Sequence, residues 1–317
     1  MSALAGLRAQ PGRMARALRD RRENLLAQRQ LPALAGPAQD ALVARLREDM
    51  RTLEAGGAAV ESPWWADVRR RLVGNVLHDD PRRFLTWPEI RETMFVDAIE
   101  PYVPVEYAAL RADAGWSTRW RTAIEEDPSG CPRRWPRDRA TSANLVHHAY
   151  HLMRFEAVAG PLADIAQVVE YGGGYGSFAR LARRTGFTGG FHIHDFAELG
   201  ALQRYFLGSV AALREDPALA ADITFGTAQS EVPPAGPGGK LFVAMWSLSE
   251  TPVVEREPWI DAMRDCSHVF LAFQHEFEGA DNRVWFDELR ERVTLRWHAV
   301  ELDHVPGGHS YLIGVPA

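Results

Sequence analysis

The pattern of hydrophobic positions changes near residue 160. Before that point apolar residues recur every three or four positions, which predicts amphipathic helices and no strand. Glycines and prolines separate the helical segments. The predicted helices cover residues 12–30, 38–55, 63–78, 87–98, 104–113 and 142–159. Residues 1–160 are therefore expected to form a helical N-terminal domain or lid.

From residue 161 to residue 317, short apolar runs alternate with helical segments. The runs predict strands at 166–171, 190–195, 222–226, 240–246, 267–275, 293–302 and 309–315. Helices are expected at 176–185, 197–213, 255–265 and 281–291. This alternation predicts an α/β domain whose mostly parallel sheet carries helices on both faces. Only residues 303–308 separate the last two strands, so these strands are expected to form a hairpin, with the final strand antiparallel to the other six.

A glycine-rich turn follows the first predicted strand. Glu170 stands two residues before Gly172, and Gly174 and Gly176 follow at alternate positions. Glycine has no Cβ, so the backbone can adopt positive φ and a ligand can lie against the main chain. Asp195 ends the second predicted strand, 23 residues after Gly172. Strand, glycine turn, helix, strand and acid occur here in the order of a nucleotide-binding βαβ unit.

The acid before the glycines indicates which nucleotide is bound. A carboxylate there repels a diphosphate but attracts an ammonium group, which favours S-adenosylmethionine. Asp195 has the spacing at which an acid hydrogen-bonds ribose hydroxyls. A nicotinamide-dependent oxidoreductase remains an alternative, because the glycine turn and Asp195 alone allow it. The residues expected to bind the cofactor are Glu170, Gly172, Gly173, Gly174, Tyr175, Gly176, Asp195, Phe196, Thr227 and Trp246.

Several segments resemble those of bacterial sugar O-methyltransferases. They are the turn at 170–176, the stretch 195–198 with Gln203 and Tyr205 beyond it, the stretch 246–250, and the histidine-rich helix at 147–151. The resemblance covers roughly residues 140–280 and departs at Ala197, where that family is expected to have proline. It implies a class I methyltransferase fold and methyl transfer from S-adenosylmethionine to a hydroxyl of a sugar or glycosylated metabolite.

Methyl transfer to oxygen is an in-line displacement that needs a positioned acceptor and a base for the hydroxyl proton. Such a base is expected near the carboxyl ends of the strands. The candidates are Glu250, His148, His151 and His275. The alternative for Glu250 is an acid stabilised by a helix N-terminus, and helix histidines are often structural. Asn144 and His148 share a helix face with His151, whereas the side chain of His147 is expected to point away from that face of the helix.

Substrate contacts are predicted at Asn144, Gln274, Glu276, Trp116 and Trp120. The aromatic side chains can stack on sugar rings, although large aromatics also fill cores. A metal-assisted reaction is a further alternative. Its ligands would be Asp303, His304 and His309 with His275 or Glu276. No closely spaced ligand pair supports that site, so no metal is expected.

Composition narrows the classes of partner. Lys and Arg total 36 against 42 Asp and Glu, a net charge of −6, so neither nucleic acid nor an anionic membrane is an expected partner. Two distant cysteines, Cys131 and Cys266, indicate a reducing, cytoplasmic compartment. Lys240 is the only lysine, which indicates a GC-rich bacterial genome. The N-terminal arginines Arg8, Arg13, Arg16 and Arg19 are expected on a solvated helix rather than a transit peptide. Pairing of two chains into a homodimer is compatible with the helical N-terminal part, and a catalytically silent methyltransferase-like scaffold is a further alternative to the enzyme.

Overall fold

A computed structural model of the chain describes residue 25, residues 27–54 and residues 63–317. The N-terminal arginines and most of the predicted helix over residues 12–30 lie outside the described residues. Among the residues that are described, no helix is long and apolar enough to cross a membrane. Cys131 and Cys266 are both buried and both free.

Seven strands form one sheet in the order β3-β2-β1-β4-β5-β9-β8. Strand β1 pairs in parallel with β2 and β4, whereas β9 pairs antiparallel with both β5 and β8. The bounds are β1 Gln167–Tyr171, β2 Gly190–His194, β3 Ile223–Gly226, β4 Lys240–Met245, β5 His268–Gln274, β8 Arg296–Glu301 and β9 His309–Val315. Each of these strands begins and ends within three residues of its predicted position.

The order and direction of these strands define the fold. A doubly wound dinucleotide-binding sheet has the order 3-2-1-4-5-6. Here a reversed strand, β9, lies between β5 and β8. This insertion is the mark of the class I methyltransferase fold, so the fold class that the sequence predicts is confirmed.

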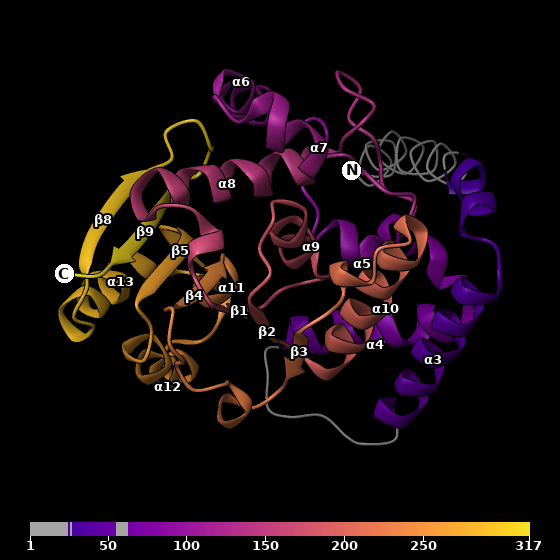
Figure 1. Ribbon diagram of the computed structural model, residues 1–317. Coiled ribbons are helices and arrows are strands. Elements are labelled where there is room, and N and C mark those ends of the chain that lie inside the picture. The colour runs from indigo at the N-terminus through magenta and orange to yellow at the C-terminus, as the bar shows by residue number, and fades with distance from the viewer. Residues whose placement is uncertain (1–24, 26, 55–62) are drawn as a thin grey trace, which may run out of the picture.

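Helices cover both faces of the sheet, because neighbouring residues of each buried strand point to opposite sides. Val168 packs with α8 (Ala143–Ala159), α9 (Ser177–Arg184) and α10 (Ala197–Arg214), and Val169 packs with α12 (Val253–Arg264) and α13 (Asn282–Arg292). Figure 1 shows α8 along one side of the sheet and α12 on the other. The central parallel strands β1, β4 and β5 are therefore buried on both faces, which explains their continuous apolar runs.

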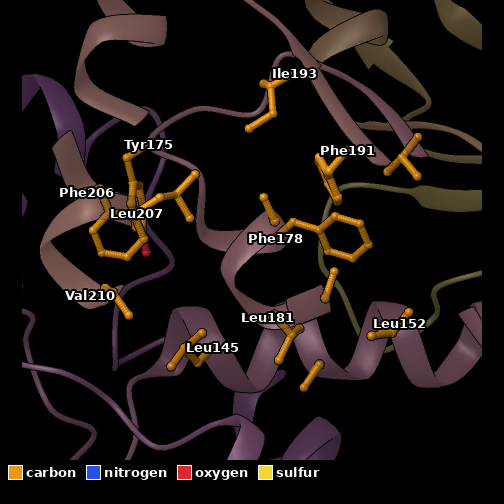
Figure 2. Close-up of a cluster of buried hydrophobic side chains, with 14 of the residues drawn as sticks. Leu145, Leu152, Tyr175, Phe178, Leu181, Phe191, Ile193, Phe206, Leu207 and Val210 are labelled. Atoms are coloured by element: carbon orange, nitrogen blue, oxygen red, sulfur yellow. The ribbon is translucent and has the colours of Figure 1, made fainter. Parts of the chain in front are cut away.

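The helical N-terminal part shares the larger core with the sheet. Its longer helices are α3 (Pro37–Glu54), α4 (Pro63–His78), α6 (Val103–Ala112) and α8. Figure 2 shows Leu145 and Leu152 of α8 facing Leu181 of α9, near side chains of β2 and α10. The secondary structure changes near residue 160, but one hydrophobic cluster runs from Val43 to Val315.

Helix α8 begins and ends where its flanking residues dictate. Ser142 Oγ accepts a hydrogen bond from Leu145 N at 3.2 Å and caps the first turn. Gly160 follows the last turn with a φ of +86°, a conformation that favours glycine. Helix α8 therefore has fixed ends, and its register places Asn144, His147 and His148 beside the sheet.

The helix predicted at 87–98 is wrong beyond its first turn. Helix α5 covers only Pro88–Arg91. After it, Val96 N donates to the side-chain oxygen of Asn144 at 3.0 Å, and Met94 packs beside Gly174. These distant contacts outweigh the local helical pattern.

The sequence also did not predict several short elements. These are α7 (Arg121–Ala123), α11 (Ser247–Glu250), the pair β6 (Glu276–Phe277) and β7 (Ala280–Asp281), the π-helix Trp116–Trp120, and the 3-10 helices Leu31–Leu34, Pro81–Thr86, Leu162–Asp164, Pro217–Leu219 and Gln229–Glu231.

Candidate active site

A cavity of about 1240 Å³ lies at the carboxyl ends of β1, β2 and β4. It is larger than the roughly 300–1,000 Å³ typical of one small-molecule site, so it has room for a cofactor and a second ligand. Nine of the ten residues predicted to bind the cofactor line it, and these are Glu170, Gly172, Gly173, Gly174, Tyr175, Asp195, Phe196, Thr227 and Trp246. Gly176 does not line it. This residue has a φ of +93° and serves the turn into α9.

The glycine turn is held against α11 so closely that a side chain cannot fit. Gly172 has a φ of +71°, and a Cβ on it would lie 2.3 Å from the Cβ of Ser247. Its neighbour Gly174 has a φ of +57° and more space around it. The first glycine is thus required both by backbone conformation and by close approach. The main chain of the turn consequently forms one wall of the cavity.

Glu170 is the side chain that points most directly to a ligand. It is 4% exposed, it lines the cavity, and its Oε2 has no hydrogen-bond partner among the described residues. Burial, and then the negative charge of Asp195, raise the pKa of Glu170 to about 8. A buried carboxyl without a partner is costly. The site therefore fits a ligand whose cationic group donates to Glu170.

Asp195 connects the second strand to the glycine turn. Its Oδ2 accepts hydrogen bonds from Gly174 N at 3.0 Å and from Gln203 Nε2 at 2.9 Å. Gln203 also donates to the carbonyl of Gly174 at 2.9 Å. Burial raises the pKa of Asp195 to about 7, although these hydrogen bonds lower it. The carboxylate thus fixes the turn while it faces the cavity, where a hydroxyl-bearing ligand can reach it.

Aromatic residues line the region beside Asp195. Phe196 lies 5.8 Å from Trp65 between ring centroids, and the Arg69 guanidinium lies 4.7 Å above the Phe196 ring. Arg69 also pairs with both oxygens of Glu198 at 2.9 Å. Thr227 lines the same end of the cavity. This end is therefore suited to a flat, uncharged ring.

Glu250 lines the cavity at the end of β4, as predicted for a candidate base. Burial raises the pKa of Glu250 to about 7, although a hydrogen bond from Gln274 opposes this shift. The Gln274 Nε2 lies 3.5 Å from Glu250 Oε1. Gln274 itself is buried and does not line the cavity, so it supports Glu250 rather than reaching a ligand.

The α8 residues divide into two groups. Asn144 and His148 line the cavity, but both make internal hydrogen bonds. Asn144 Nδ2 donates to Tyr175 Oη at 2.7 Å, and His148 Nδ1 lies 3.0 Å from Ser177 Oγ. Burial, and then the charge of His147, lower the pKa of His148 to about 3. His148 is therefore a weak base in this setting.

Besides Gln274, five predicted catalytic or substrate residues do not line the cavity. His151 is fully buried and bonds through Nδ1 to the Tyr311 hydroxyl. His275 bonds to Ser310 Oγ at 2.8 Å, and Glu276 is exposed. Two tryptophans pack within the helical part instead. Trp116 meets Tyr107 at 5.5 Å between centroids, and Trp120 donates to Asp113 at 2.9 Å.

The histidine that the sequence analysis set aside is the one in the best position. His147 lines the cavity, and its ring stacks on Trp246. Its Nδ1 lies 2.9 Å from each carboxylate oxygen of Glu106. The helix pattern alone pointed it away from the ligand. Glu106 lies 41 residues earlier in the chain, so no local spacing could reveal the pair.

The alternative metal ligands do not form a cluster. His304 bonds to Glu106, and His309 accepts from Trp246 Nε1 at 2.8 Å. His275 and Glu276 lie elsewhere, as described above. Among residue 25, residues 27–54 and residues 63–317, no group of three histidine, cysteine or acidic residues is arranged to hold a metal ion.

Solved methyltransferase structures are similar to this chain at low sequence identity. The ribosomal protein L11 methylase from Lactobacillus delbrueckii subsp. bulgaricus is 13% identical over 54% of this chain and 80% of its own, with a TM-score of 0.38. A SAM-dependent methyltransferase from Aquifex aeolicus is 12% identical over 67% and 97% of the two chains, with a TM-score of 0.38. An O-methyltransferase family protein from Burkholderia thailandensis is 13% identical over 54% and 59%, with a TM-score of 0.37.

No protein-family model and no curated protein sequence matches the chain. Because the TM-scores of the structural matches are low, the fold class rests on the strand order and direction of the chain itself.

Proposed function

We propose that this protein is an S-adenosylmethionine-dependent O-methyltransferase that acts on a hydroxyl of a sugar or glycosylated metabolite. The observation that carries the proposal is the buried, unpartnered carboxyl of Glu170 beneath a glycine turn in a class I methyltransferase fold. A cationic amino group supplies what this carboxyl lacks. A diphosphate would instead bring negative charge beside two buried acids, Glu170 and Asp195.

The cavity offers a suitable residue for each part of this methyl donor, from its methionine end to its adenine. Glu170 would take the amino group of the methionine moiety, and Asp195 would accept hydrogen bonds from the ribose hydroxyls. Phe196 and Thr227 would bound the adenine, at the end of the cavity nearest β3. Trp246 would offer a ring face to the sulfonium. When bound, the donor supplies an electrophilic methyl group at the β4 side of the cavity.

The charge of the cavity limits the acceptor. Among the described residues, its lining has eight acidic side chains, Glu92, Asp97, Glu100, Glu170, Asp195, Glu198, Glu250 and Glu255, against two arginines, Arg69 and Arg91. Both arginines pair with acids of this set, Arg69 with Glu198 and Arg91 with Asp97. Such a lining disfavours a phosphate- or carboxylate-bearing acceptor. It supports a neutral, hydroxyl-rich acceptor, as a saccharide is.

Methyl transfer to defined sugars tests the proposal. The full chain would be incubated with S-adenosylmethionine labelled in the methyl group and with methyl glycosides of hexoses, pentoses and 6-deoxyhexoses. The expected result is label in a base-stable methyl ether, which excludes an ester, and loss of that label in Glu170→Ala. Binding of the donor without transfer to any hydroxyl, or transfer only to nitrogen, contradicts the proposed reaction.

A further inference from the structure

Glu106 and His147 form a buried carboxylate–imidazole pair beside the cavity. Glu106 lies on α6 and is 0% exposed, and His147 lies on α8 and is 3% exposed. Both carboxylate oxygens of Glu106 are 2.9 Å from His147 Nδ1, and one also lies 3.2 Å from His304 Nε2. The two histidines that hold this carboxylate come from distant segments, one from α8 and one from the loop between β8 and β9.

The contacts determine which nitrogen of His147 is left for a ligand. Burial alone would raise the pKa of Glu106, but the charges and hydrogen bonds of His147 and His304 lower it below its ordinary value. Glu106 is therefore an acceptor, and His147 Nδ1 carries the proton of their hydrogen bond. Nε2 makes no hydrogen bond to any described residue. Because His147 lines the cavity, Nε2 is the nitrogen that remains to accept a proton there.

The imidazole lies at the end of the cavity where the methyl group is expected. Its ring stacks on Trp246 with centroids 5.2 Å apart and planes 24° apart. Trp246 follows β4 with a φ of +63°, and its Nε1 donates to His309 Nδ1 at 2.8 Å. His309 Nε2 in turn donates to the Pro306 carbonyl at 3.0 Å. These hydrogen bonds fix Trp246, which supports His147. Trp246 follows β4, which lies on one side of β1, whereas β2 and β3 lie on the other side and border the end of the cavity proposed for adenine.

We infer that His147 is the general base of the proposed methyl transfer and that Glu106 is its positioning residue. This inference rests on the proposed function. The acceptor oxygen forms a bond to the methyl carbon, the carbon–sulfur bond breaks, and its electron pair returns to sulfur. The hydroxyl proton passes to His147 Nε2, and Glu106 stabilises the imidazolium that results. The proton then leaves to water when the product departs.

Two other cavity groups are less suited to this task. His148, the next residue on α8, bonds to a serine hydroxyl and has no carboxylate partner among the described residues to stabilise its charged form. Glu250 lies near the amide of Gln274 and feels the negative charge of Glu278. Glu250 therefore fits a role in holding a hydroxyl or amino group of the acceptor. Comparison of His147→Gln with Glu250→Gln separates the role of general base from that of holding the acceptor.

The test compares variants of the full chain by binding and by turnover. S-adenosylhomocysteine affinity is measured by calorimetry, and kcat and KM are measured with labelled donor and the methyl glycoside on which the wild type is most active. His147→Gln is expected to lower kcat by about 100-fold or more, which is the contribution typical of a general base. Its affinity for S-adenosylhomocysteine is expected to stay within about threefold of wild type. Glu106→Gln is expected to lower kcat without raising KM, and Glu106→Asp to restore part of it. His298→Gln on β8, outside the cavity lining, controls for loss of a histidine.

The outcomes separate this inference from the proposed function. A wild type that binds no S-adenosylhomocysteine, or transfers no methyl group, removes the proposed function. An active wild type with an equally active His147→Gln variant, or a kcat lost only in Glu250→Gln, overturns the assignment of the base.

A second measurement tests the pair without any acceptor. Nitrogen-15 NMR of the side chains in the S-adenosylhomocysteine complex identifies which ring nitrogen of His147 carries the proton. The proton is expected on Nδ1 with a bare Nε2, and Glu106→Gln is expected to abolish this preference. A proton on Nε2 in the neutral ring overturns the inference, whatever the identity of the acceptor.

Discussion

The Oδ2 atom of Asp195 lies 3.0 Å from the amide nitrogen of Gly174, so the acid that ends β2 directly holds the turn that follows β1. A single carboxylate therefore shapes the turn and faces the cavity. Asp195→Ala should lower the free energy of unfolding by about 1–3 kcal/mol, because buried donors lose their acceptor. It should also weaken S-adenosylhomocysteine binding.

Asp195→Asn is the matched control, because an amide oxygen can still accept from Gly174. Its effects on urea unfolding and on calorimetric binding should both be smaller than those of Asp195→Ala. Equal effects of the two substitutions would show that the hydrogen bond to the turn has no special role.

The close contact at Gly172 predicts a difference between two glycines of one turn. Gly172→Ala should be less stable than Gly174→Ala by about 1–3 kcal/mol, the usual cost of overpacking. Both substitutions place alanine at positive φ, but only the first directs a Cβ into Ser247, at 2.3 Å. Urea unfolding of the ligand-free variants measures this difference. If Gly174→Ala is the less stable variant, the packing described for the turn is incorrect.

The contribution of the buried acids to stability should fall as the pH rises, because these acids retain their protons in the folded chain. The pKa of Glu170 is about 8 in the folded protein against an ordinary value of 4.5. Between these values this carboxyl binds fewer protons in the unfolded chain than in the folded chain, so its contribution to the free energy of unfolding decreases with increasing pH. The pKa of Asp195, about 7, and that of Glu250, about 7, act in the same direction.

Glu170→Gln removes one of these groups, so the stability of the wild type relative to this variant should decrease with increasing pH, most clearly between about pH 5 and pH 8. Urea unfolding of both proteins across this range, without ligand, provides the measurement. Saturating S-adenosylhomocysteine should also reduce the slope of the wild type, because its amino group keeps Glu170 ionised. Parallel curves for the two ligand-free proteins would refute the burial of this carboxyl.

Asn144 joins three segments around the cavity and should therefore be important for stability. Its Oδ1 accepts from Val96 N at 3.0 Å, and its Nδ2 donates to Tyr175 Oη at 2.7 Å. Asn144→Ala should lower the free energy of unfolding by about 1–3 kcal/mol, because it leaves buried polar groups unpaired. Ser142→Ala, which removes the α8 cap, should cost about 1 kcal/mol. Only Asn144→Ala should weaken S-adenosylhomocysteine binding, and equal loss of binding in both variants would argue against a role at the cavity.

Local patterns were sufficient for the sheet and for the glycine turn. Strands β1, β4, β5 and β9 are buried on both faces, so continuous apolar runs and the intervening helices mark them clearly. The turn could be predicted because Gly172 has a positive φ, a backbone conformation that residues other than glycine rarely adopt. The spacing from Gly172 to Asp195 follows from the length of one βαβ unit.

Contacts between distant segments could not be predicted in the same way. His147 and His151 lie on the same helix, and only the fold shows that the first lines the cavity whereas the second is sealed against Tyr311. The segment after Arg91 has a helical pattern, but the backbone of Val96 pairs with Asn144 instead. The base proposed here depends on Glu106, which the topology of α6 and α8 brings to His147.

The most direct test of the central claim is a calorimetric titration of the full chain with S-adenosylhomocysteine and, separately, with NAD. We expect one S-adenosylhomocysteine to bind per chain, no heat from NAD, and a loss of roughly ten- to a hundredfold in affinity for Glu170→Gln, as for one hydrogen bond to a charged group. Binding of NAD in preference to S-adenosylhomocysteine, or unchanged affinity in Glu170→Gln, would contradict the account.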